Sequence, residues 1–499
     1  MAHHFANEIP AHLSMWQRVR EYAVPPSMIE TATARRAVGD WAGACAAARV
    51  HVDLDLRAVR DRHGTEIVTR LRADLRRLAP DLLRWHMPRI APDGRLRPAL
   101  TISLARYGGS GRTPPHLVVR TPPARADAGQ HLSLALWEGP GSRNPGHHPH
   151  PHPDRRFRLD LHRHLWDAGR SRELAERCGA SPARSPATPA PSRVTHHPFM
   201  AVGPDQLGGH DSLWAVGSWA AEAELLLRAE GRPRGAFAVR LGARNRIVLE
   251  LFAPDDSHVP VFRPLREDVL PPRQQIAALP VLPEAAARVL PDLELLRAGL
   301  IPPERLHPLV AEALAASTPA TPGESAPEPG DPHRVECRGE NHRIALRDGV
   351  LTAVDHDPGE LRREELLVAF GGPPLPCLRV IDAVHRDPEA LPAVRERLRH
   401  GDFTGALAVI EGLFGPGAIL RDGPLRTELE SAAARRIDHG LFRSGLVTGH
   451  PGAGTAGGEG TPGTGRATKG HRLRLDRRTP LPVRRKMSSR SRPRISLAP

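Results

Sequence analysis

Hydrophobic and polar residues follow helical and strand periods along most of the first 446 residues. Apolar positions three and four apart predict an amphipathic helix over 67–78, which Pro80 interrupts. Strict alternation over 50–56 predicts a strand. Three further strands, separated by glycine and proline, are predicted at 100–107, 117–121 and 132–137. The first block of the chain is therefore predicted to combine helices with strands.

The same periods recur later in the chain. Alternation over 236–241 and 246–252 predicts a hairpin, and 334–354 predicts a three-stranded meander. The run from Asp357 to Glu360 supplies the N-cap, N1 and N3 residues of a capping box, so a helix is expected to begin there. Further helices are predicted at 213–228, 283–290, 291–298, 308–315 and 425–441.

Proline-rich stretches divide the chain, because proline fixes φ and lacks a backbone donor. They predict an α+β protein of two or three small mixed units of antiparallel strands and helices, with proline-rich spacers and a disordered C-terminal tail. The prolines could instead lie in long surface loops of one body. The predicted blocks are an N-terminal unit 1–137, spacers 138–198 flanking a short amphipathic piece 155–180, a middle unit 199–316, a linker 317–332, a C-terminal unit 333–446 and a basic tail 447–499.

One eight-residue pattern occurs twice. Gly39-Asp40-Trp41-Ala42-Gly43-Ala44-Cys45-Ala46 is echoed by Gly401-Asp402-Phe403-Thr404-Gly405-Ala406-Leu407-Ala408. Each copy resembles the turn and second-helix start of a tetratricopeptide-type hairpin, in which small residues allow close helix packing. A tetratricopeptide array needs tandem units about every 34 residues. The echo therefore predicts two separate helical hairpins and no repeat protein.

The net charge of +14 is concentrated at the C-terminal end. Residues 447–499 contain 12 of the 70 lysines and arginines and only two acids, whereas the rest of the chain is nearly neutral. Lysine occurs only at Lys469 and Lys486, and the remaining basic residues are arginine. This composition is typical of a GC-rich bacterial genome, so arginine abundance alone does not indicate a function.

The tail offers basic candidates for contact with nucleic acid or another acidic partner. Such an arm would bind phosphates without sequence specificity, and it has no aromatic residue for base stacking. A tail without a defined partner, and an extension not shared by close relatives, are the alternatives. The candidate residues are Arg484, Arg485, Lys486, Arg490, Arg492 and Arg494.

The four cysteines, Cys45, Cys178, Cys337 and Cys377, are far apart in sequence and form no zinc-ribbon spacing. So sparse a set suits free thiols in a reducing compartment. The N-terminal residues have neither the charged region nor the apolar run of a signal peptide, so the cytoplasm is expected. No uncharged apolar stretch reaches the length of a membrane span, so no membrane association is predicted.

A histidine cluster at His147, His148, His150 and His152 has the chemistry of a metal ligand set. These residues lie in a proline-rich spacer without a rigid frame, and no cysteine is near. We therefore expect adventitious affinity for divalent metals, and predict neither an evolved metal site nor a cofactor.

Asp53 and Asp55 are the only candidate catalytic residues that we single out. Two carboxylates at i and i+2 of a strand share a face and could hold magnesium against a triphosphate. The D-h-D-h pair resembles that of the nucleotidyltransferase superfamily, which implies Mg²⁺-dependent nucleotide transfer. The superfamily's upstream Gly-Ser is Gly43-Ala44 here, so the phosphate-binding serine is missing. The alternative is an edge strand whose polar face meets water.

Asp355-His356-Asp357 also has the composition of a metal or acid/base group. The helix-capping role expected of Asp357, and the position of Asp355 at a strand end, explain these residues without chemistry.

Three hypotheses of function follow. The leading one is a non-enzymatic cytoplasmic protein that interacts with an unidentified protein partner or regulates it. The second is a divergent nucleotidyltransferase-like enzyme using Asp53 and Asp55. The third is a nucleic-acid-associated protein that binds through its basic tail.

Overall fold

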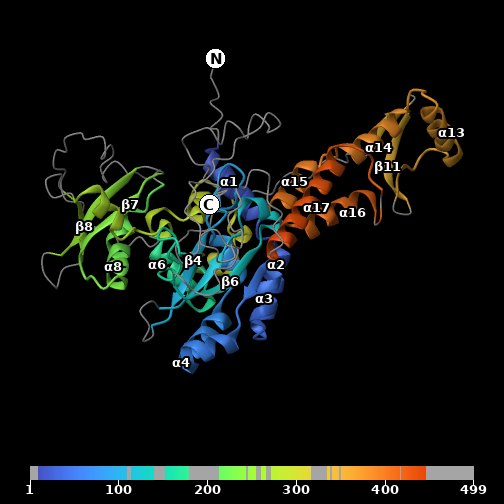
Figure 1. Cartoon of the computed structure of the whole chain (residues 1–499). Coiled ribbons are helices and arrows are strands. Elements are labelled where there is room, and N and C mark those ends of the chain that lie inside the picture. The colour runs from blue at the N-terminus through green and yellow to red at the C-terminus, as the bar shows by residue number, and fades with distance from the viewer. Residues whose placement is uncertain are drawn as a thin grey trace, which may run out of the picture. The chain divides into compact units, whose positions relative to one another are not determined.

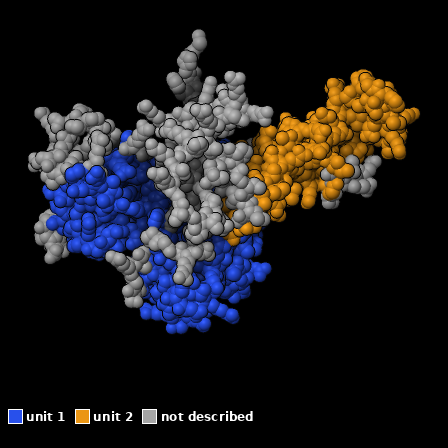
Figure 2. All heavy atoms as spheres, in the orientation of Figure 1, with its two compact units in different colours: residues 1–123, 132–320, 464–499 blue, residues 124–131, 321–463 orange. Residues whose placement is uncertain are grey.

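The computed structural model describes most of the chain up to residue 444. It forms two compact units (Figure 2). Unit 1 comprises residues 1–123, 132–320 and 464–499, and unit 2 comprises 124–131 and 321–463. Both mix helices with small sheets, so the predicted α+β class is confirmed. The described residues are 9–108, 114–139, 152–178, 213–242, 245–253, 260–265, 271–315, 334–337, 340–347, 350–415, 417 and 419–444.

Unit 1 contains the elements from α1 to α12 apart from two short turns (Figure 1). Its helices are α1 (Ala11–Tyr22), α2 (Pro26–Ala37), α3 (Trp41–Ala47), α4 (Leu56–Arg77), α5 (Pro80–His86), α6 (Leu174–Arg177), α8 (Trp219–Ala229), α9 (Arg273–Ala278), α10 (Glu284–Ala287), α11 (Pro291–Arg297) and α12 (Pro308–Ala315). Its 3₁₀ turns are η3 (Arg163–Leu165), η4 (Ala168–Glu173), η5 (Val216–Ser218) and η7 (Pro303–Arg305). Its strands are β1 (Val50–Asp53), β2 (Arg89–Ile90), β3 (Arg95–Leu96), β4 (Thr101–Arg106), β5 (His116–Arg120), β6 (Leu132–Trp137), β7 (Gly235–Arg240), β8 (Arg246–Phe252) and β9 (Val261–Pro264).

The principal sheet of unit 1 has the order β1-β6-β5-β4. β4, β5 and β6 pair antiparallel, whereas the edge strand β1 runs parallel to β6, with Val50 opposite Leu132. β1 ends at Asp53, so it is shorter than the predicted strand 50–56. The predicted hairpin around 242–245 is formed by β7 and β8, to which β9 is added.

One large apolar core contains side chains from the first hundred residues and from residues 293–314 of unit 1. It contains Leu71 of α4, Trp85 of α5 and Trp166 after η3, together with Leu295 of α11 and Val310 of α12. A separate cluster around Trp219 and Phe237 lies between α8 and the β7–β9 sheet. The C-terminal helices α11 and α12 therefore belong to the same core as the first hundred residues.

In its described residues, unit 2 contains a three-stranded antiparallel sheet of order β10-β11-β12 and five helices. Its elements are η1 (Ala124–Ala126), η2 (Ala128–Gln130), β10 (Arg334–Cys337), β11 (Glu340–Arg347), β12 (Val350–Ala353), α13 (Pro358–Ala369), α14 (Pro376–Arg386), α15 (Leu391–Arg399), α16 (Phe403–Phe414) and α17 (Pro424–Arg443). The meander and the helices at 358 and 424 occur where the sequence pattern predicts them, whereas α14 was not predicted.

Two apolar clusters form the interior of unit 2. The larger one packs α15, α16 and α17 through residues such as Val394, Phe414 and Leu425. The smaller one lies between the sheet and α14, which together form the sheet end of unit 2. Among the described residues, its buried members are Cys337, Ala353, Leu375 and Cys377, and Val335, Leu361 and Leu378 pack against them partly buried.

Candidate functional sites

Asp53 and Asp55 belong to different elements. Asp53 is the last residue of β1, and Asp55 is the N-cap of α4. The Asp55 carboxylate accepts hydrogen bonds from the backbone N–H groups of Arg57 at 2.9 Å and Ala58 at 3.0 Å. These hydrogen bonds lower the pKa of Asp55. The strand ends early because aspartate satisfies the free N–H groups of a helix start, so the two carboxylates do not alternate along one strand.

Of the predicted histidine cluster, His147, His148 and His150 lie outside the described residues. The ring of His152 lies edge-on to that of Trp137, with 6.2 Å between centroids. The basic candidates of the tail, from Arg484 to Arg494, also lie outside the described residues. For both groups the metal and nucleic-acid predictions stay predictions.

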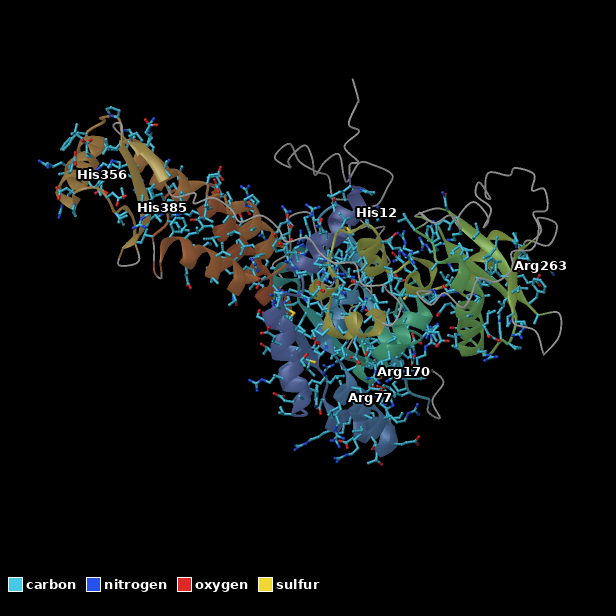
Figure 3. The ribbon with its side chains drawn as sticks, turned by 180° about the vertical axis from the view of Figure 1, so that it is seen from behind. His12, Arg77, Arg170, Arg263, His356 and His385 are labelled. Atoms are coloured by element: carbon cyan, nitrogen blue, oxygen red, sulfur yellow. The ribbon has the colours of Figure 1, made fainter. Side chains whose placement is uncertain are left out.

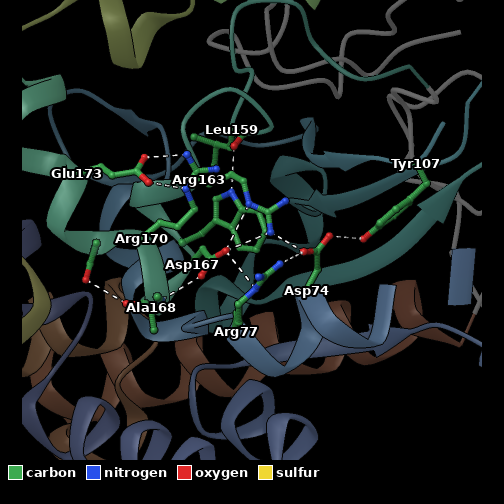
Figure 4. A network of polar contacts seen from close by, with 12 residues as sticks. Asp74, Arg77, Tyr107, Leu159, Arg163, Asp167, Ala168, Arg170 and Glu173 are labelled. Carbon is green, nitrogen blue, oxygen red and sulfur yellow. Dashed lines mark hydrogen bonds and ion pairs between the residues drawn. The ribbon is translucent and has the colours of Figure 1, made fainter. Parts of the chain in front are cut away.

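In unit 1, partly exposed arginines surround the buried carboxylates of Asp74 and Asp167 (Figure 4). Asp74 accepts hydrogen bonds from Arg163, from Arg77 at 2.8 Å and from the Tyr107 hydroxyl at 2.9 Å. Arg163 also donates to Asp167 at 3.1 Å. Burial would raise the pKa of Asp74, but the hydrogen bonds and charge of Arg163 outweigh it and lower the pKa. The Asp74 carboxylate is held as an anion by fixed partners, which is the arrangement of a structural network.

A second buried network surrounds Glu222 of α8. His162 approaches it at 3.1 Å and Arg177 donates at 2.7 Å. Burial alone would raise the pKa of Glu222, whereas the hydrogen bonds from His162 and Arg177 lower it, to about 2. The network joins α6 and the segment before η3 to α8. Its charged groups therefore stabilise the packing of these elements against one another.

A polar cavity in unit 1 has a volume of about 220 Å³ and is lined by arginines. Arg155 donates to the carbonyl oxygen of Ala278 at 3.1 Å. Arg158 donates to Asp160 at 2.8 Å and to Glu230 at 2.7 Å. The guanidinium groups of Arg155 and Arg158 are engaged with the protein itself, and the remaining arginine of the lining, Arg232, does not make a ligand site alone, so we assign no ligand to this cavity.

The sheet end of unit 2 brings two cysteines and a histidine together. Cys337 ends β10, His356 follows β12, and Cys377 is the second residue of α14. Their possible ligand atoms all lie within 4.8 Å of one another. All three side chains are buried, and Figure 3 labels His356 in this part of the molecule. Thiolate and imidazole groups at this spacing form a set that could hold a metal ion.

Electrostatics at this cluster favour the neutral thiol of Cys377 when no cation is bound. Burial raises the pKa of Cys377 to about 12, and the hydrogen-bonded Cys337 thiol and the Asp355 carboxylate contribute further. A second histidine is adjacent, because the ring of His342 on β11 stacks on that of His356 with 4.0 Å between centroids. The cluster thus has two buried thiols and two buried imidazoles.

The α13 helix presents an apolar surface to solvent. Leu366 and Leu367 are each 55 % exposed and Phe370 is 89 % exposed. None of the residues of α13 is buried. Leu366, Leu367 and Phe370 lie on one stripe of the helix, which Arg362 and Arg363 extend toward its N-terminus.

Neither the Cys–His cluster nor the exposed stripe of α13 follows from a local sequence pattern. Cys337, His356 and Cys377 are separated by 18 and 20 residues, and no short ligand motif spans such intervals. In the sequence His356 stands between Asp355 and Asp357, far from both cysteines. The confirmed role of Asp357 is N-cap of α13, where its carboxylate accepts from the N–H of Glu360 at 3.1 Å. Exposure of α13 could not be found from a pattern, because it depends on what packs against the helix.

No protein-family model, curated protein or solved structure matches the chain. In the part of the chain that the structure describes, no helix combines the length and the apolar character needed to cross a membrane.

Proposed function

We propose that the protein is a non-enzymatic cytoplasmic protein that acts through protein contacts, and that α13 carries the contact surface. The observation that supports this proposal is the exposure of Leu366, Leu367 and Phe370 side by side on one helix. Single exposed apolar residues are ordinary on protein surfaces, whereas a contiguous group marks an interaction site.

The charges beside this stripe indicate the chemistry of the partner. Arg362 and Arg363 are exposed, and among the described residues neither pairs with a carboxylate. Arg363 instead donates to the carbonyl oxygen of Gly359 at 3.2 Å. A complementary partner has apolar side chains opposite Leu366 and Phe370 and carboxylates opposite the arginines. We therefore propose an amphipathic helix with acidic residues about one turn from its apolar stripe as the occupant.

The test is affinity capture from cell extract with the full-length chain as bait, at about 0.3 M salt, where charges are screened over roughly 6 Å. The double variant Leu366→Ser/Phe370→Ser should lose the captured partner, and Arg362→Glu/Arg363→Glu should weaken capture. Val38→Ser is the matched control, because Val38 is 79 % exposed and lies on unit 1. Capture that the double variant leaves unchanged would contradict the proposal.

Binding must then be repeated with the purified partner. A synthetic peptide of its acidic amphipathic helix should compete with the whole partner for the bait. Competition by a peptide in which the carboxylates are amides should be weaker, because the arginines would lose their counter-charges.

A further inference from the structure

The sheet end of unit 2 contains a buried imidazole nitrogen without a hydrogen-bond partner among the described residues. His356 is 9 % exposed, and among the described residues its Nε2 atom has no hydrogen-bond partner. A buried nitrogen without a partner is costly, because it has lost its hydrogen bond to water. It lies beside two buried thiols, which are themselves poor hydrogen-bonding groups.

The donor set selects the class of ligand. Thiolate sulfur and imidazole nitrogen together favour Zn²⁺ over magnesium or calcium, which prefer oxygen. Two ligand atoms about 2.3 Å from a common tetrahedral ion lie about 3.8 Å apart. The limit of 4.8 Å between the ligand atoms of Cys337, His356 and Cys377 is close to this value. Small side-chain rotations would therefore complete the coordination.

We propose that unit 2 binds one structural Zn²⁺ ion through Cys337, His356 and Cys377, with His342 as the fourth ligand. His342 is buried on β11, and its ring lies parallel to that of His356 within 17°. Rotation of this ring toward the thiols would give the Cys₂His₂ set of a closed structural site. The low exposure of all four side chains leaves no open position for a substrate.

The ion would add stability to this part of unit 2, where few apolar side chains of the described residues are buried. Two of the four buried members of the small cluster are the cysteines themselves. A structural metal ion adds stability where few apolar side chains are buried. The four ligands come from β10, β11, the turn after β12 and α14, so one ion would join four segments of unit 2. His356 also directly precedes Asp357, the N-cap of α13, so the ion would hold the base of that helix.

Metal content of the full-length protein is the first test. Protein purified under reducing conditions and passed through a weak chelator should retain one zinc per chain. Replacement of zinc by Co²⁺ should produce sulfur-to-cobalt charge-transfer absorption, which histidines alone cannot give. Cys337→Ser and Cys377→Ser should each abolish that absorption, whereas Cys178→Ser, which alters a cysteine of unit 1, should leave it unchanged. His342→Ala should weaken zinc binding more than about tenfold.

The histidine-rich spacer provides the main competing explanation. Zinc retained equally by the Cys337→Ser/Cys377→Ser double variant would show adventitious binding elsewhere and would overturn the proposal. A Cys337–Cys377 disulfide in protein isolated with thiols blocked at lysis would also overturn it.

Thiol protection in the unaltered chain keeps the proposal testable if the variants do not fold. Alkylation followed by mass mapping should show Cys337 and Cys377 protected in the presence of zinc and modified after a strong chelator. The reactivity of Cys178 should be the same in both states. Equal modification of Cys337 and Cys377 with and without the chelator would contradict the site. This readout does not depend on α13. The proposal of a zinc site and the proposal of a contact surface are therefore tested independently.

Discussion

The turn between α2 and α3 in unit 1 and the turn between α15 and α16 in unit 2 have nearly the same local geometry. Gly39 and Gly401 have φ values of +79° and +82°. Asp40 and Asp402 follow with φ/ψ of −79°/71° and −81°/69°, and each caps the next helix. Both carboxylates accept a hydrogen bond from the N–H group three residues on, at 2.8 Å and 3.2 Å.

The surroundings of these two turns differ. A Cβ atom on Gly39 would have no atom within 4 Å, whereas one on Gly401 would lie 2.7 Å from the Gly129 Cα atom and nearer to its carbonyl group. The Asp40 side chain is 37 % exposed and that of Asp402 is 6 % exposed. The comparison shows that the short sequence sets the shape of the turn, while the packing around it sets how much each residue contributes to stability.

Gly401→Ala is expected to have the largest effect. The left-handed backbone costs about 1–2 kcal/mol for a residue with a Cβ, and the collision with Gly129 adds about 1–3 kcal/mol. We expect the free energy of unfolding of unit 2 to fall by about 3 kcal/mol or more. Hydrogen exchange of α15–α17 would measure the loss. If Gly401→Ala lowered the free energy of unfolding no more than Gly39→Ala does in unit 1, packing around the turn would not set the contribution of the glycine.

Acid is expected to weaken the buried network around Glu222 in unit 1. The folded pKa of Glu222, about 2, lies below its ordinary value of 4.5. Its stabilisation is therefore complete above about pH 4.5 and is lost as the pH falls toward 2, by roughly 3 kcal/mol. Hydrogen exchange of α8 should accelerate over this range. Glu222→Gln should remove this contribution to the pH dependence. If the exchange of α8 still accelerated with acid to the same extent in the variant, the effect could not be assigned to Glu222.

The stability lost when each helix cap is removed should be larger for the more buried aspartate. Asp40→Ala removes a partly exposed cap and an exposed contact with Arg35 at 3.3 Å, so we expect about 1 kcal/mol. Asp402→Ala removes a buried cap that also accepts from Arg397 at 2.8 Å, so we expect about 2 kcal/mol. Urea titrations of the two variants compare these costs directly. Asparagine at each position should restore most of the cap, and equal losses for both alanine variants would count against a role for burial.

Gly39→Ala is expected to have the smallest effect, about 1 kcal/mol, because only backbone strain opposes it. Gly39→Asn should cost less, since asparagine tolerates the left-handed conformation better. Thermal unfolding of both variants is sufficient to measure this difference. A large loss in Gly39→Ala would show that the turn has a packing role that the open space around it does not indicate.

Several elements could be predicted because their signals are local. Asp357 and Pro358 predicted the start of α13, and the glycine–aspartate pairs predicted both hairpins. The strand over 50–56 was predicted too long, because alternation cannot show that Asp55 caps α4. The helix α14 was missed, although its second residue is one of the two clustered cysteines.

The sequence by itself determined the α+β class, the two capped hairpins and the three-stranded meander, since helix caps, turns and alternation act over a few residues. Only the tertiary structure decided that α11 and α12 join the core of the first hundred residues, and that Cys337 meets His356 and Cys377. It also decided that the apolar stripe of α13 stays exposed. These features depend on contacts between residues far apart in sequence. Such contacts follow from the packing of the chain in three dimensions, and no short pattern encodes them.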